Sequence, residues 1–203
     1  MIFMKWKTKL ALLCAALAMG HDLPAQTDHH IIKGEKAAHF SGTDQNGLPI
    51  FSTELLKSGP VVLLFYRGNW CPYCQKQLSE LQDSLQMLLE TGAHVVVFTP
   101  EKSEGIQQMI GKTGATFSIV HDDKYETMKA YGLDFQLSRE TVPRFYNFTL
   151  NHTRKANGNE DDILPVPATY IIGQDGLVKW LWYDRDYRNR PSVEMIMKAL
   201  QEL

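Results

Sequence analysis

The feature that most constrains the fold is a buried strand that leads directly toward an amphipathic helix. Residues 61–66 form an apolar, β-branched run after a Gly-Pro pair, which is typical of a strand covered on both faces. From Leu78 to Leu89 the leucines recur mostly at steps of three and four, and Gly92 follows them. That spacing predicts a helix with one apolar face that ends near the glycine.

The rest of the chain continues this alternation of strands and helices. Residues 134–164 are polar and lack a clear period, so we expect them to be irregular. Gln174-Asp175-Gly176 predicts a hairpin between the last two strands, and Ser103 and Ser192 are expected helix N-caps. The predicted strands are residues 94–98, 117–120, 168–172 and 177–183, and the predicted helices are residues 103–110, 125–131 and 192–200. This order indicates one α/β domain whose sheet has a mixed edge.

Composition excludes several classes of protein. The 203 residues are 44% hydrophobic and 22% charged, which is ordinary for a globular chain and unlike a disordered one. The formal net charge is −2, so there is no basic surplus for many phosphate contacts and no nucleic-acid partner is expected. No apolar run reaches the roughly 18 residues of a clear membrane-spanning helix, which excludes a multi-pass membrane protein.

The first 25 residues have the pattern of a cleaved signal peptide. Three lysines precede an apolar stretch at residues 10–19, and a small residue stands just before Gln26. A buried N-terminal helix and an uncleaved anchor are the alternatives, but the apolar stretch is short for either. We therefore expect an exported protein, periplasmic or secreted, with no membrane contact beyond this segment.

With Cys14 inside the signal segment, two cysteines remain for the mature chain. Cys71 and Cys74 have C-x-x-C spacing, which closes too small a loop for a useful structural disulfide. A closed zinc site needs about four ligands, and there is no second C-x-x-C pair to supply them. We therefore expect a redox-active disulfide between Cys71 and Cys74 and no resident metal.

The position of the pair assigns a role to each thiol. Cys71 is expected at the helix N-terminus, because Pro72 suits the first helical position, where its missing N–H costs nothing. Exposed N–H groups and the helix dipole lower the pKa of a thiol placed there. This predicts Cys71 as the nucleophile and Cys74, one turn further in, as the resolving thiol.

Three segments carry a family resemblance. They are residues 65–74, which read FYRGNWCPYC, residues 164–172, which read LPVPATYII, and a leading hairpin in residues 40–56. Over residues 37–203 the chain resembles the peroxiredoxin-like branch of the alkyl hydroperoxide reductase/thiol-specific antioxidant (AhpC/TSA) family. The resemblance implies an α/β, thioredoxin-like fold with an N-terminal β-hairpin and a peroxiredoxin-like βα insertion. Helices are expected to flank its central mixed sheet.

The resemblance and the positions of residues near the thiol pair suggest further site residues. Pro167 is expected in the cis form, with the backbone of Val166 open to an extended substrate; an edge-strand proline is the alternative. Trp70 is expected as a substrate platform beside the disulfide, or else as a core residue. Arg67 and Arg190 are expected to act electrostatically on the thiols, although Arg67 also fits a solvated surface position.

The chain departs from the peroxiredoxin pattern P-x-x-x-[ST]-x-x-C in both registers. Counted from Cys71, the proline and hydroxyl positions hold Leu64 and Gly68; counted from Cys74, they hold Arg67 and Cys71. The hydroxyl that would bind peroxide is therefore missing. Peroxidase activity at Cys74 would need Cys71 to replace that hydroxyl.

The predicted function is that of an exported thiol–disulfide oxidoreductase and antioxidant. It would need no cofactor beyond its disulfide, with an external thiol protein as reductant and protein or small-molecule disulfides as substrates. One alternative is a thiol-dependent peroxidase that reduces hydroperoxides through a sulfenic acid. The non-enzyme alternative is a module that carries soft copper on its thiol pair.

Overall fold

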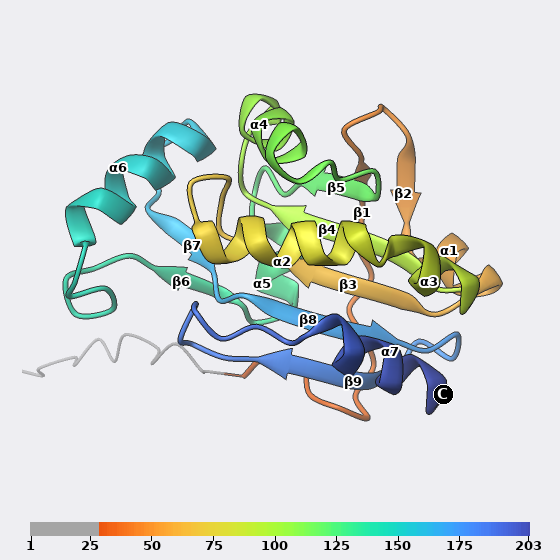
Figure 1. The fold of residues 1–203 in the computed structure, drawn as a ribbon. Helices are drawn as coiled ribbons and strands as arrows, with labels where there is room; N and C mark the ends of the chain where they lie inside the picture. Colours follow the sequence, from red (N-terminus) through yellow and green to blue (C-terminus); the bar gives the residue numbers. More distant parts are fainter. Residues whose placement is uncertain (1–28) are drawn as a thin grey trace, which may run out of the picture.

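A five-stranded mixed sheet forms the centre of the molecule (Figure 1). The computed structural model describes residues 29–203, so the predicted signal peptide lies outside the described residues. The strand order is β5-β4-β3-β8-β9. The strands are β3 (Val61–Phe65), β4 (His94–Thr99), β5 (Ser118–His121), β8 (Ala168–Ile172) and β9 (Val178–Tyr183). The first three are parallel, and β8 and β9 add to them in antiparallel fashion, which confirms the predicted mixed edge.

Helices cover both faces of this sheet, which explains why β3 is apolar at every position. Val62 and Leu64 face a cluster built from α2 (Pro72–Asp83), α3 (Leu85–Glu90), α4 (Ser103–Thr113) and α7 (Val193–Gln201). Val61, Leu63 and Phe65 face a second cluster that includes side chains from α5 (Glu126–Ala130) and from the N-terminal hairpin. Because successive side chains of a strand point to opposite faces, a strand between two helical layers reads as a continuous apolar run.

The predicted N-terminal hairpin is present. Strands β1 (Ser41–Thr43) and β2 (Pro49–Phe51) pair in antiparallel fashion, and the turn includes Gly47 at φ +81°. Asp44 holds this turn by accepting hydrogen bonds from the N–H groups of Asn46 (2.8 Å) and Leu48 (3.0 Å). Helix α1 (Ser52–Ser58) follows directly and leads into β3.

The expectation that residues 134–164 are irregular was wrong. They contain a small antiparallel sheet of β6 (Asp134–Gln136) and β7 (Ile163–Pro165), and the twelve-residue helix α6 (Tyr146–Asn157). The side chains that α6 buries, at Thr149, Thr153 and Asn157, recur at four-residue spacing but are polar. Hydrophobic periodicity therefore did not detect this helix.

Of the two predicted N-caps, one is confirmed. The Ser192 hydroxyl accepts a hydrogen bond from the N–H of Met195 at 3.3 Å at the start of α7. The prediction for Ser103 was wrong, because Ser103 is itself the first residue of α4 and Lys102 occupies the cap position. Within residues 29–203, no helix is long and apolar enough to cross a membrane.

Candidate active site

The two cysteines lie where β3 is followed by α2, as the sequence predicted. Cys71 is the N-cap of α2 in extended conformation, Pro72 is its first residue, and Cys74 lies in its first turn. The Cys71 carbonyl accepts a hydrogen bond from the N–H of Cys74 at 3.1 Å. The N–H of Cys71 donates a hydrogen bond to the carbonyl of Gly68. Both thiols are buried and free, so the structure shows the reduced state; the predicted disulfide stays a prediction.

Arg190 reaches Cys74 from the other end of the chain. It lies in the segment between β9 and α7, and its Nη2 is 3.7 Å from the Cys74 Sγ. Its Nη1 donates to the carbonyl of Asn189 at 2.8 Å, while its buried Nε has no hydrogen-bond partner among the described residues. Arg190 therefore lies beside the thiol of Cys74, which is consistent with its predicted electrostatic role.

Arg67 is buried, so the alternative of a solvated surface arginine is wrong. It is only 3% exposed, and its guanidinium carbon lies 5.0 Å from the ring centre of Trp70 and 4.2 Å from that of Tyr187. Both aromatic faces stabilise a cation by cation–π attraction. No carboxylate pairs with Arg67 within residues 29–203, so its charge acts on the two thiols.

The contact of Arg190 and the pKa directions of the two thiols favour the opposite order of acidity to the predicted one. Burial raises the pKa of the Cys74 thiol, but the hydrogen bond from Cys71 and the charges of Arg190 and Arg67 outweigh burial and lower that pKa. The pKa of Cys71 is raised by its hydrogen bond to Cys74, by burial and by the negative charge on Cys74. The helix N-terminus alone favoured Cys71, but Arg190 lies beside Cys74. These directions favour the thiolate on Cys74 in the reduced pair.

The loop before α2 is held in place by a buried carboxylate that sequence reasoning missed. Glu101 follows β4, and its Oε1 accepts hydrogen bonds from the N–H and the Nδ2 of Asn69, both at 2.7 Å. From α4, Lys112 Nζ donates to the Asn69 carbonyl (2.8 Å) and Oδ1 (3.2 Å). One signal was available: Glu101 and Cys71 both follow carboxyl ends of parallel strands, where α/β proteins place functional residues.

The prediction of a cis proline at Pro167 was wrong. No cis peptide bond occurs between residues 29 and 203, so the Val166–Pro167 bond is trans. The N–H of Val166 is also not open to a substrate, because it donates to the carbonyl of Leu133 at 2.7 Å. The small β6–β7 sheet precedes this segment and ends beside Leu133 and Val166, which accounts for the occupied N–H. A substrate role for Val166 and Pro167 stays a prediction without this support.

Trp70 lies between the thiol pair and α6. Its half-buried ring packs at 6.4 Å from the ring of Phe148 and at 5.9 Å from that of His152, both on α6. Gly68 leaves room for the indole, since a Cβ there would stand 2.3 Å from Trp70 Nε1. The role of Trp70 as a substrate platform stays a prediction.

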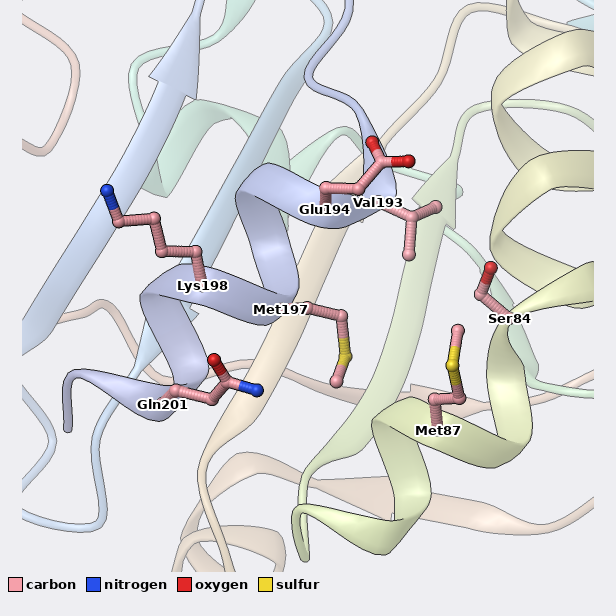
Figure 2. Close-up of a pocket in the computed structure, with 7 residues that line it drawn as sticks. All are labelled: Ser84, Met87, Val193, Glu194, Met197, Lys198 and Gln201. Atoms are coloured by element: carbon pink, nitrogen blue, oxygen red, sulfur yellow. The ribbon is translucent and has the colours of Figure 1, made fainter.

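Two further observations concern other kinds of site. Within residues 29–203, no group of three His, Cys, Asp or Glu side chains is placed to hold a metal ion. A shallow surface groove lies between α7 and α3, and Figure 2 shows the side chains of Met87 and Met197 facing it. The lining residues are Ser84, Met87, Val193, Glu194, Met197, Lys198 and Gln201. Neither thiol lines this groove.

The fold and the site together define a class of protein. A thioredoxin-like sheet presents two thiols at the start of a helix, with an arginine beside the more acidic one, and this is the arrangement of a thiol-based oxidoreductase. The chain belongs to the AhpC/TSA family, since the sequence model of that family matches residues 33–181, well over half of the chain. Its redox role is peroxiredoxin-like, as the family and its curated relatives indicate.

Curated relatives agree with this assignment. The chain is 25% identical over 173 residues to chloroplastic Peroxiredoxin Q of Sedum lineare, which covers 85% of this chain and 80% of the relative. It is 26% identical over 169 residues to chloroplastic Peroxiredoxin Q of Arabidopsis thaliana, covering 83% and 67%.

Solved structures show the same fold. Peroxidoxin BcpB from Mycobacterium tuberculosis superposes with a TM-score of 0.65 at 19% identity, covering 86% of this chain and 99% of that one. A cysteine-to-serine variant of PrxQ from Xylella fastidiosa gives a TM-score of 0.66 at 16% identity, covering 86% and 98%. These similarities confirm the predicted thioredoxin-like, peroxiredoxin-like architecture.

Proposed function

We propose that this protein is a thiol peroxidase in which Cys74 attacks the peroxide and Cys71 resolves the product. The observation that carries the proposal is the contact of Arg190 Nη2 with Cys74 Sγ at 3.7 Å. A guanidinium beside a buried thiolate stabilises the negative charge before the reaction, and it can also hold the peroxide oxygens. The leading hypothesis from the sequence, with Cys71 as nucleophile, lacks this support, since no arginine makes such a contact with Cys71 within residues 29–203.

When the family pattern is counted back from Cys74, Cys71 stands at the position of the missing hydroxyl. Three residues before an attacking Cys74, the family pattern has Thr or Ser, which donates a hydrogen bond to the thiolate or peroxide. With Cys74 ionised, the neighbouring Cys71 thiol is the group that can donate to it, and a thiol is a weaker donor than a hydroxyl. The same thiol is then in place to form the disulfide.

The proposed reaction balances without a cofactor. The Cys74 thiolate attacks the terminal peroxide oxygen, the O–O bond breaks, and the leaving alkoxide or hydroxide takes up a proton, which leaves a sulfenic acid on Cys74. The Cys71 sulfur then attacks Cys74, the S–O bond breaks, and water leaves as the disulfide forms. An external thiol protein reduces that disulfide by exchange.

The test is a comparison of two substrates with the same protein. We expect rapid consumption of hydrogen peroxide and of a small alkyl hydroperoxide in the presence of a thiol reductant, and much slower reduction of the disulfides of insulin. Fast insulin reduction with no peroxide consumption would instead favour the disulfide oxidoreductase. A dithiol titration that is altered by Cu(I), with neither activity present, would favour the copper module.

We also propose that the protein is exported. The support is the lysine-rich start and the apolar stretch at residues 10–19. N-terminal sequencing of the protein from its native host is expected to begin near Gln26. An intact Met1 on protein recovered from the cytosol would contradict export, and leave the thiol chemistry untouched.

A further inference from the structure

Glu101 is a buried carboxylate that the proposed thiol chemistry does not yet use. Its side chain is fully buried just after β4, and no ion pair reaches it within residues 29–203. Its Oε1 accepts both hydrogen bonds from Asn69, while its Oε2 is buried with no hydrogen-bond partner among the described residues. An ionised carboxylate in such a place is costly, because burial removes water and nothing replaces it at one oxygen.

The groups that surround Glu101 come from four elements. Tyr66 follows β3, and its buried hydroxyl faces Glu101 and Thr99 without a hydrogen bond of regular geometry. Helix α4 packs closely, since a Cβ on Gly105 would stand 3.0 Å from the Glu101 carboxyl carbon. Lys112, also on α4, donates to Asn69 and forms no ion pair with Glu101 within residues 29–203. Cys74, on α2, packs in the same buried cluster as Tyr66 and interacts electrostatically with Glu101.

Each negative charge in this cluster makes a second negative charge less favourable. Burial raises the pKa of Glu101, the two bonds from Asn69 and the nearby Tyr66 hydroxyl partly offset this rise, and a thiolate at Cys74 raises the pKa further. Burial and the charges of Glu101 and Cys74 raise the pKa of Tyr66 in the same way. The enclosed cluster therefore favours one negative charge over two.

We propose that Glu101 and Cys74 share one negative charge, so that Glu101 holds a proton while Cys74 is a thiolate and releases it when Cys74 is oxidised. The proposal rests on Cys74 being the thiolate of the proposed function. Glu101 is then a redox-linked proton donor near the thiol pair, and Tyr66, whose hydroxyl faces Glu101, packs in the same buried cluster as Cys74.

With this assignment, the protein and the hydroperoxide together supply every proton that the oxidation needs. The reduced site has a Cys74 thiolate, a Cys71 thiol and a protonated Glu101. Reaction with one hydroperoxide gives the disulfide, an ionised Glu101, an alcohol and water. The two sulfurs supply the two electrons, and the protons of Cys71, Glu101 and the hydroperoxide account for those of the products. No proton is taken from solvent.

Infrared difference spectroscopy of the full chain tests the proposal directly. Oxidising the dithiol with diamide, which does not depend on peroxidase activity, is expected to remove the carbonyl band of one protonated carboxylic acid. The band should be absent from the reduced Glu101→Gln variant. It should persist in Glu104→Gln, a matched control on the exposed first turn of α4. A spectrum of the native chain with no such loss would overturn the proposal, whether or not the variants fold.

Proton uptake gives a second, independent measurement. In weakly buffered solution near neutral pH, oxidation of the native protein by hydrogen peroxide is expected to take up no proton. Oxidation of Glu101→Gln should take up one per disulfide, since its leaving hydroxide must find a proton in solvent. Equal uptake by both proteins would contradict the proposal. Absence of any peroxide reaction would count against the proposed function alone, because the diamide experiment would still report on Glu101.

Discussion

Replacing Cys74 by serine is expected to abolish peroxide consumption, by roughly three orders of magnitude or more, since the variant lacks the nucleophile. The Cys71→Ser variant should still react once with peroxide, because the Cys74 thiolate and Arg190 are both retained. It should then stop with a sulfenic acid on Cys74, since the resolving thiol is missing. Single-turnover peroxide consumption, with a dimedone label located by mass spectrometry, measures both effects.

The two cysteine variants serve as controls for each other, because each removes one sulfur from the same turn of α2. Retained peroxide reaction in Cys74→Ser, with the label on Cys71, would reverse the two roles. That outcome would restore the assignment that the position of Cys71 at the helix N-terminus first suggested. Equal loss in both variants would contradict the assignment of Cys74 as the only thiol needed for the first step, because serine at position 71 still offers a hydrogen-bond donor.

Replacing Arg190 by methionine is expected to slow the peroxide reaction by about a hundredfold, the usual effect of removing one preorganised donor. The guanidinium lowers the pKa of Cys74 by favouring its thiolate, so its removal raises that pKa and leaves less thiolate at neutral pH. The rate of Cys74 alkylation by iodoacetamide, followed against pH, should therefore shift to higher pH. Arg190→Lys, which keeps the charge but not the planar group, should fall between the two.

Arg188→Met is the matched control for this prediction. Arg188 lies two residues away in the same segment, but its side chain is exposed and pairs with Asp186 at 2.6 Å. Its loss should leave the pH profile of Cys74 in place. A profile that moves equally in both variants would show that the segment, and not the contact of Arg190 with the thiol, is responsible.

Local pattern was sufficient for much of the fold. The run of residues 61–66 marked a strand between two layers because both of its faces are covered, and the leucine spacing marked the helix after it. The helix in residues 134–164 was missed because α6 buries threonines and an asparagine, and polar side chains at helical spacing resemble a loop. A helix with a polar buried face differs from a loop in which side chains it buries, and residue type alone does not show this.

For the site, the sequence by itself determined the chemistry available: two thiols three residues apart, at the start of a helix that follows a buried strand. These are local facts, set by spacing and by helix geometry. Which thiol carries the charge was decided only by tertiary structure, because Arg190 lies 116 residues from Cys74 and meets it through the packing of the β9–α7 segment. Glu101 is likewise brought to Asn69 by the parallel pairing of β3 with β4. Electrostatic interactions depend on distance in space and on burial, and neither can be read from sequence spacing.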